Sequence, residues 1–120
     1  MPLRHQKIGN TVVLSPGGRL DHASAEAFRE AVQPWLEGCH GNAGGHALVF
    51  DLAELEYISS AGLRVLMLAS KQSKPVGGRI AVAAAPPVVA EIFKISRFDL
   101  VFPMYATVAA AVAAFAGATE

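Results

Sequence analysis

The feature that most constrains the fold of this chain is the almost wholly apolar run from Ala47 to Leu52. Runs of this kind are typical of parallel strands that are buried on both faces of a sheet. Parallel strands are joined by crossover connections, which are nearly always right-handed and pack helices against the sheet. Because helical and strand patterns alternate from Ala47 onward, the sequence predicts an α/β domain.

A helix is predicted over residues 61–73, after this strand and a polar corner. Its inward stripe is expected at helical spacing and comprises Leu63, Leu66, Met67 and Ser70. The elements expected downstream are a strand over 79–84, a helix that begins at Pro86 and Pro87 with Val89, Ile92 and Phe93 inward, an edge strand from Asp99 to Pro103, and a helix from Thr107 to Phe115 with Val108, Val112 and Phe115 inward.

Two short strands are expected to open the chain, over 4–8 and 11–14, with Gly9-Asn10 as a hairpin turn. After a break at 15–21, Asp21 or Ser24 should cap a helix that Pro34 kinks or shortens. The apolar face of this helix comprises Ala27, Phe28, Ala31, Val32, Trp35 and Leu36. A hairpin beside parallel strands makes the sheet mixed. We therefore expect one α/β domain over residues 1–120, with about four or five strands and about four helices.

Composition limits the kinds of partner. The 120 residues are 52% hydrophobic and 17% charged, and the charges cancel to a formal net charge of +0. This balance predicts neither a nucleic-acid partner nor binding to an anionic membrane surface. The longest uncharged apolar run, 106–118, is shorter than the roughly 20 residues that span a bilayer. A single cysteine, Cys39, and the lack of a signal-peptide pattern predict a cytoplasmic protein.

The polar corner before the helix over 61–73 reads Ser59-Ser60-Ala61-Gly62. Ser59 or Ser60 should cap the helix by accepting a hydrogen bond from one of its first backbone N–H groups. The first turn has no Asp or Glu, and Gly62 would let another group approach closely. A phosphorylated serine would fit this positive helix end, although capping alone is the commoner use of such a pair.

Other readings of the chain are weaker. Cys39, His40 and His46 share a glycine-rich loop, but their spacing matches no zinc pattern and a fourth ligand is missing. The loop also lacks the Lys-Ser/Thr ending of a phosphate-binding loop. We therefore expect a solvated loop with no metal and no cofactor.

A catalytic function is not predicted either. A serine hydrolase needs a Gly-x-Ser-x-Gly elbow with His and Asp partners, and the polar corner does not supply that elbow. His5 and His22 are far from the corner in sequence. Asp21 and Asp51 as an acid/base pair are less consistent with the pattern than a helix cap and a strand-end turn. We expect no catalytic residue.

Several motifs occur in order along the chain, namely Gly18-Arg19-Leu20-Asp21, Asp51-Leu52, Tyr57-Ile58-Ser59-Ser60-Ala61-Gly62-Leu63, Gly77-Gly78-Arg79-Ile80 and Tyr105-Ala106-Thr107. In these motifs the chain resembles the STAS family, the anti-sigma factor antagonists of bacteria, over nearly its whole length. The resemblance implies a partner switch: the protein binds an anti-sigma factor that is also a serine kinase of the GHKL type, and thereby frees a sigma factor. Phosphorylation of one serine cancels the binding, and a serine phosphatase restores it.

Family members often read Asp-Ser-Ser/Thr-Gly-Leu at the corner, with the first Ser phosphorylated. The resemblance therefore implies Ser60 as the phosphoacceptor, with Ser59 in the place of the aspartate and as second choice, and Ala61 in the place of the neighbouring hydroxyl. The expected partner-binding residues are Leu20, Asp21, His22, Ser59, Ser60, Ala61, Gly62, Leu63 and Arg64. Exposed Lys71 and Lys74 either extend this face or only solvate the helix.

The family also contains members with other roles, as scaffolds in stress-signalling complexes and as regulatory subunits of lipid-transport ATPases. A binding role without phosphorylation is therefore the alternative. The isolated chain is expected to be a monomer or a weak dimer.

Overall fold

The computed structural model describes residues 3–118. In chain order, the elements are β1 (Leu3–Ile8), β2 (Thr11–Pro16), β3 (Gly18–Leu20), α1 (Ala25–Glu37), β4 (Ala47–Asp51), β5 (Leu55–Ile58), α2 (Ser60–Ser73), η1 (Lys74–Val76), β6 (Ile80–Ala83), α3 (Pro87–Ile95), η2 (Phe98–Leu100), β7 (Met104–Tyr105) and α4 (Val108–Ala118), where η marks a 3-10 turn.

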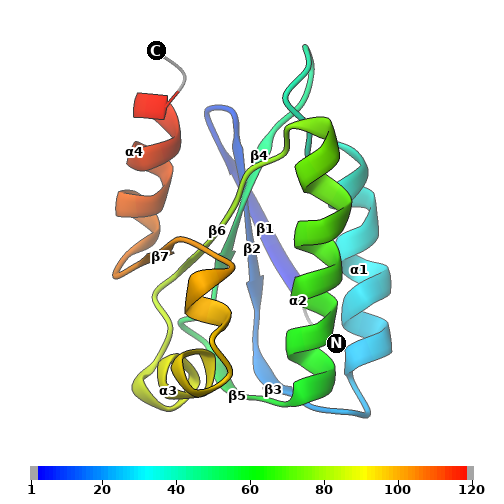
Figure 1. The fold of residues 1–120 in the computed structure, drawn as a ribbon, viewed down its shortest axis with the longest axis vertical. Coiled ribbons are helices and arrows are strands. Elements are labelled where there is room, and N and C mark those ends of the chain that lie inside the picture. The colour runs from blue at the N-terminus through cyan, green and yellow to red at the C-terminus, as the bar shows by residue number, and fades with distance from the viewer. Residues whose placement is uncertain (1–2, 119–120) are drawn as a thin grey trace.

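A mixed sheet of five strands forms the centre of the fold, in the order β1-β2-β4-β6-β7 (Figure 1). β1 runs antiparallel to β2, and the later neighbours are parallel. The predicted hairpin is present, and Gly9 adopts φ +59° at its turn, a conformation that favours glycine. The predicted α/β fold with a mixed sheet is confirmed.

The helices cover both faces of this sheet, and the side chains of β4 alternate between the two layers. Leu48 and Phe50 belong to the core beneath α1, α2 and α3, whereas Val49 packs with Ala111 and Phe115 of α4. In Figure 1, α1 and α2 lie on one side of the sheet and α4 on the other. The apolar run that begins at Ala47 is therefore buried on both faces, as the sequence predicted.

A second, two-stranded sheet was not predicted. β3 pairs in parallel with β5. β3 lies inside residues 15–21, which were expected only to end the second strand. β2 continues to Pro16, and Gly18 then adopts φ +76° and donates its N–H to the carbonyl of Glu54 (3.1 Å). Strands of three and four residues are too short to show a period in the sequence, and they depend on pairing between distant segments.

The prediction of an edge strand from Asp99 to Pro103 is wrong. Residues 98–100 form the 3-10 turn η2, and the edge strand is β7, which pairs with β6 through Val82 and Met104. Pro103 has no N–H to donate, but its carbonyl accepts a hydrogen bond from the N–H of Val82 (3.0 Å). The hydrogen-bond ladder between β6 and β7 therefore begins at the carbonyl of Pro103 and continues into β7.

Helix α1 corrects two further expectations. It runs through Pro34 for 13 residues, so the proline does not shorten it. Pro34 is exposed, so the helix carbonyl that lacks its N–H partner is on the solvent side, where it can be hydrated. Ala27, expected inward, is exposed, whereas Ala25 is buried. In α2, Met67 was also expected in the core but is only half-buried.

None of the helices formed by residues 3–118 combines the length and the apolar character needed to cross a membrane.

Candidate functional site

The serine corner, residues 59–62, is held in place by the small sheet. β5 ends at Ile58, and the N–H of Ser59 donates to the carbonyl of Leu20 at the end of β3 (2.9 Å). The chain then turns directly into α2, whose inner side is packed in the core through Leu66 and Ala69. The corner is therefore attached to rigid elements on both sides.

The two serines of the corner differ in their hydrogen bonds. Ser59 is the N-cap of α2, and its Oγ accepts from the N–H of Gly62 (3.3 Å). Ser60 is the first helical residue, is exposed, and within residues 3–118 its hydroxyl makes no hydrogen bond. The sequence left the capping residue open between the two serines, and the structure assigns it to Ser59. The hydroxyl of Ser60 is consequently the one available to an external group.

The glycine at position 62 is required by packing inside the protein, and not by a group that approaches from outside. A Cβ at this position would lie 2.8 Å from Cγ of Leu20, 2.9 Å from Cγ1 of Ile58 and 3.0 Å from the carbonyl of Leu20. The close approach inferred from the sequence is thus made by β3. Leu20 and Gly62 are both buried, so these two expected partner-binding residues support the corner from below and offer no surface themselves.

Ser60 opens onto a shallow groove of about 520 Å³ between the start of α2, the β3–α1 loop and the end of α3. Its lining residues are His22, Ser60, Ala61, Leu63, Arg64, Met67, Ser96 and Phe98. The apolar members are Leu63, Met67 and Phe98, and no carboxylate is among the lining residues. The groove therefore combines an apolar base with a free hydroxyl and basic side chains.

Sequence reasoning missed the contribution of α3 and η2 to this groove. Ser96 and Phe98 line it, and the neighbouring Ile95 and Leu100 are 74% and 77% exposed. Large apolar side chains that are exposed close in sequence to groove-lining residues are consistent with an interaction surface. A signal was present in the sequence, because Ile95 falls off the predicted inward stripe of the helix that carries Val89 and Phe93.

The β3–α1 loop presents His22 to the groove and is fixed by Asp21. The Asp21 carboxylate accepts hydrogen bonds from the backbone N–H groups of Ser24 and Ala23 (both 3.1 Å). These bonds, that from Ser24 first, hold the pKa of Asp21 below its usual value. Ser24 occupies the N-cap position of α1, but its side chain makes no capping bond. Asp21 therefore orders the loop, and His22 is exposed beside it.

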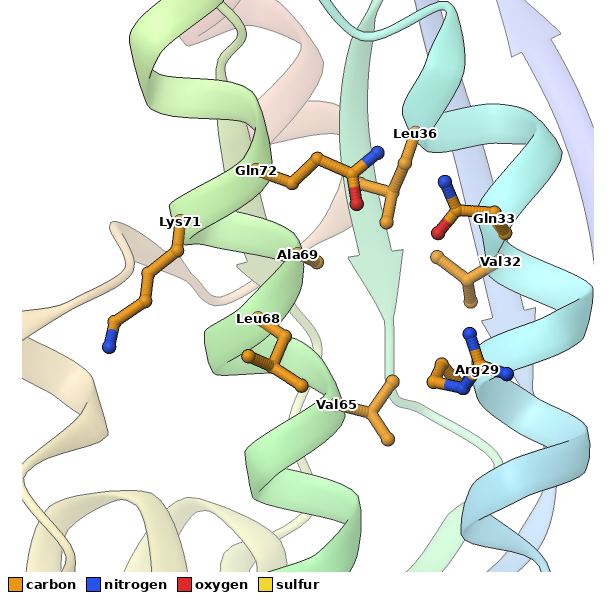
Figure 2. A pocket seen from close by; sticks show the side chains of 9 residues that line it. All are labelled: Arg29, Val32, Gln33, Leu36, Val65, Leu68, Ala69, Lys71 and Gln72. Carbon is orange, nitrogen blue, oxygen red and sulfur yellow. The ribbon is translucent and has the colours of Figure 1, made fainter.

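A second groove, of about 440 Å³, lies between α1 and α2 (Figure 2). Val32 and Leu36 of α1 face Val65 and Ala69 of α2, and Gln72 extends across toward α1. Lys71 lines the α2 side, and Arg29 on the α1 side is paired with Glu26 of its own helix. None of the serines of the corner belongs to this groove. Lys74 is exposed in η1, beyond the end of α2.

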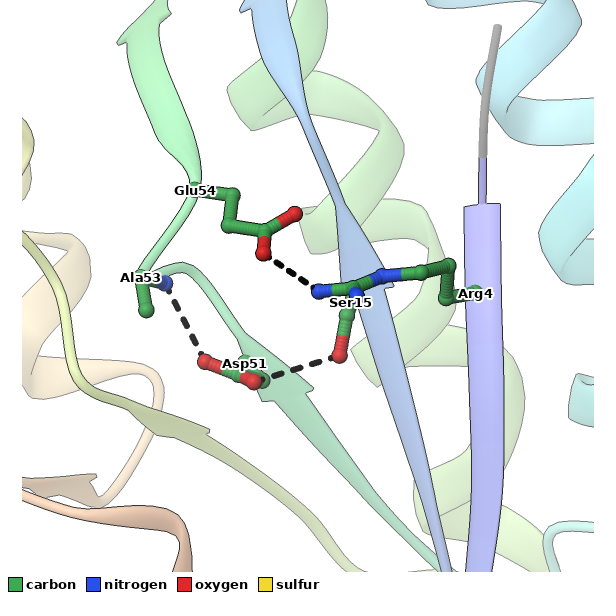
Figure 3. A network of polar contacts seen from close by, with 5 residues as sticks. All are labelled: Arg4, Ser15, Asp51, Ala53 and Glu54. Atoms are coloured by element: carbon green, nitrogen blue, oxygen red, sulfur yellow. Dashed lines mark hydrogen bonds and ion pairs between the residues drawn. The ribbon is translucent and has the colours of Figure 1, made fainter.

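Asp51 has a structural role at the end of β4 (Figure 3). Its carboxylate accepts from the N–H of Ala53 (3.1 Å) and from the hydroxyl of Ser15 in β2 (3.2 Å). Arg4 in β1 forms an ion pair with Glu54 (2.5 Å) beside it. The carboxylate thus forms the predicted strand-end turn and links it to the neighbouring strand.

The glycine-rich loop, residues 38–46, uses its side chains internally. The Cys39 thiol is buried and lies 3.7 Å from the carbonyl of Arg79, and burial raises its pKa. Nε2 of His46 lies 2.8 Å from the carbonyl of Trp35, and Nδ1 of His40 accepts from the N–H of Asn42 (3.2 Å). Across residues 3–118, no group of three His, Cys, Asp or Glu side chains is arranged to hold a metal ion.

Comparisons with known proteins agree with this architecture. The STAS domain profile matches residues 3–111. A Bordetella bronchiseptica protein, BtrV, which its name describes as a candidate anti-sigma factor antagonist, is 36% identical over 115 residues, which cover 96% of this chain and 95% of BtrV.

Two solved structures illustrate the likeness in three dimensions. An anti-sigma factor antagonist from Mycobacterium paratuberculosis superposes with a TM-score of 0.82 at 25% identity, covering 94% of this chain and 92% of the other. The antagonist SpoIIAA in its unphosphorylated form superposes with a TM-score of 0.78 at 21% identity, covering 97% of each chain. With the sheet order, the serine corner and the profile match in agreement, this chain belongs to the STAS domain family.

Proposed function

We propose that the protein is an anti-sigma factor antagonist whose binding to an anti-sigma factor is controlled by phosphorylation of Ser60. The observation that carries the proposal is the free, exposed hydroxyl of Ser60 at the start of α2, next to a Ser59 that is engaged as the cap. The name of BtrV supports a role as an anti-sigma factor antagonist. SpoIIAA, which shares the fold, has been solved in an unphosphorylated and a phosphorylated form, and this supports control by phosphate.

The proposed partner-binding face is the groove around Ser60 with its rim. His22, Ser60 and Arg64 are exposed on it, and Asp21, Ser59 and Ala61 are half-buried. Leu63 lies at its apolar base, and Ile95 and Leu100 extend the apolar surface beyond the residues that the sequence suggested. The proposed partner is an anti-sigma factor and serine kinase of the GHKL type in the cytoplasm, with a serine phosphatase as the opposing enzyme.

The chemistry is a phosphoryl transfer. The bond between the γ-phosphorus of ATP and the bridging oxygen breaks, ADP leaves, and a new bond forms to Oγ of Ser60. The serine proton passes to a base of the kinase. Hydrolysis by the phosphatase returns the hydroxyl and releases inorganic phosphate.

The switch acts on the complex and leaves the fold unchanged. A phosphoserine carries about −1.5 to −2 charges, and the helix start offers roughly +0.5, so the modified chain remains stable. A partner packed against Leu63 and Ala61 would have to desolvate the dianion. A loss of about 3 to 4 kcal/mol corresponds to roughly two to three decades in affinity.

The test begins with affinity capture on the unmodified protein from an extract of the source organism, followed by mass spectrometry, which is expected to identify a GHKL-type kinase. Incubation of that kinase with ATP and the protein should add one phosphate, and peptide mapping should place it on Ser60. Ser59→Ala serves as the matched control and should still be labelled, whereas Ser60→Ala should not. Labelling on Ser59 would contradict the assignment, and capture of an ATPase without labelling would favour a transport-regulatory role.

A further inference from the structure

We infer that Arg64 responds to the state of Ser60: its guanidinium binds a carboxylate of the partner when Ser60 is unmodified, and binds the phosphate of its own chain when Ser60 is phosphorylated. This inference rests on the proposed function of Ser60. It gives phosphorylation a second effect on binding. The phosphate would introduce a repulsive charge, and it would also remove the attractive contact between Arg64 and the partner's carboxylate.

The first argument is the position of the two residues on α2. Ser60 and Arg64 are four residues apart on one helix, and both line the same groove. Residues at i and i+4 are neighbours on one helix face, with Cβ atoms about 5–6 Å apart. Because the Cα–Cβ bonds of a helix tilt toward its N-terminus, a long side chain at position 64 in the usual helical rotamers reaches back over the turn that carries Ser60.

The second argument is the availability of the guanidinium. Arg64 is exposed, and among residues 3–118 it has neither a hydrogen bond nor an ion pair. Four other arginines are engaged: Arg4 pairs with Glu54, Arg29 pairs with Glu26, Arg79 donates to the carbonyl of Phe115, and Arg19 lies over the ring of Tyr57. The side chain of Arg97, like that of Arg64, has no partner within residues 3–118, but Arg97 is not among the residues that line the groove. The positive charge beside Ser60 is therefore not neutralised inside the molecule.

The third argument is the composition of the groove. From the β3–α1 loop it receives His22, and from the end of α3 it receives Ser96, which precedes the exposed Arg97. No carboxylate lines it to compete for Arg64. A guanidinium matches the geometry of both carboxylate and phosphate and binds either through two parallel hydrogen bonds. The same side chain therefore suits both states, but only one at a time.

The test uses protein in which phosphoserine is inserted at position 60 during translation, so that no kinase is needed. Phosphorus NMR gives the second pKa of the phosphate in the parent protein, in Arg64→Gln, and in the matched control Lys71→Gln. Lys71 is an exposed cation on the same helix, eleven residues beyond Ser60 and therefore roughly 16 Å along its axis. We expect the pKa in the parent to be about 0.3 lower than in Arg64→Gln, and unchanged in Lys71→Gln.

A second measurement tests the unmodified state with the captured anti-sigma factor. Arg64→Gln should weaken binding about tenfold when Ser60 is bare, and less than threefold when residue 60 carries the phosphate, as expected of coupled groups. Equal phosphate pKa values in the parent and Arg64→Gln, or equal losses of affinity in both states, would overturn the inference. Failure of the proposed function would appear differently, as equal binding of the phosphorylated and unmodified proteins.

Discussion

The two ends of α2 lie beside two glycine-containing regions whose polar side chains are used differently. The serine corner stands at its start, and the glycine-rich loop lies at its far end, where the N–H of Gly41 donates to the carbonyl of Val76 in η1 (2.9 Å). In the loop, Cys39 is buried and His46 contacts the carbonyl of Trp35. In the corner, the hydroxyl of Ser60 has no partner within residues 3–118.

The difference shows which observation identifies a functional region in this fold. Both regions contain glycines that allow close approach, Gly62 against Leu20 and Gly45 against His40. A glycine in close contact therefore does not distinguish the two regions. The distinction is whether the polar groups are satisfied internally, because a group with an internal partner contributes to stability, whereas an exposed group without one is available for recognition.

The largest effect on stability is expected from Gly62→Ala. The new Cβ would press on Leu20 and Ile58 at 3.0 Å or less, including the Leu20 carbonyl, and overpacking of this kind typically destabilises by about 1–3 kcal/mol. Urea unfolding should show this loss. Gly17→Ala is the control, because its Cβ would meet only Glu54 at 3.8 Å or more, and it should change stability by less than about 0.5 kcal/mol. Equal stability of the two variants would contradict the tight contact beneath the corner.

The next largest effect on stability is expected at His46, and we compare it with His22 beside the serine corner. His46→Ala removes the contact with the Trp35 carbonyl and should lower the free energy of unfolding by about 1–2 kcal/mol. His22→Ala, at an exposed residue of the Ser60 groove, should stay within about 0.5 kcal/mol. Binding to the captured anti-sigma factor should show the reverse order. The comparison fails if His22→Ala unfolds more easily than His46→Ala.

The two serines give a smaller and more local contrast. Ser59→Ala loses the cap of α2 and should destabilise by about 1 kcal/mol, whereas Ser60→Ala should be nearly neutral because its hydroxyl bonds to nothing within residues 3–118. Thermal unfolding of the two variants, measured side by side, tests the assignment. A larger loss in Ser60→Ala would mean that Ser60 is the structural serine.

The smallest effect concerns the pH dependence of the β3–α1 loop. The pKa of Asp21 is lowered in the folded state, first by the hydrogen bond from the N–H of Ser24. Its stabilising contribution is therefore present above the ordinary value of 3.8 and is lost as the pH falls through the lower folded pKa. Urea midpoints of the parent and Asp21→Asn should differ at pH 7 and converge in acid. A constant gap at every pH would show that the carboxylate charge has no role.

Much of the fold follows from local sequence patterns. The apolar run from Ala47 identified β4, and the Gly9-Asn10 turn identified the first hairpin. β3 and β5 were missed because each is stabilised by the other across more than 30 residues, which no local pattern reports. The predicted edge strand was misplaced for a related reason, since pairing with β6 decides that β7 begins at Met104.

The candidate site was only partly predictable: the residue pattern indicated the corner, and the family resemblance also indicated His22, Leu63 and Arg64, which line the groove with Ser60. The sequence indicated a serine cap and a glycine that permits close approach, but the group approaching Gly62 is Leu20, which is 42 residues away. Which of Ser59 and Ser60 caps α2 could be decided only from the hydrogen bond that the N–H of Gly62 donates. The contribution of Ser96 and Phe98 to the groove depends on how α3 and η2 turn back toward α2, which is a tertiary property.

The central claim is that the state of Ser60 controls binding while the fold stays the same. The most direct measurement compares unmodified protein with protein carrying phosphoserine at position 60, by titration against the captured anti-sigma factor and by thermal unfolding of the same samples. We predict a loss of roughly two to three decades in affinity with an unfolding midpoint that stays within about 2 °C. Equal affinities, or a loss of affinity that accompanies a large drop in the midpoint, would contradict the claim.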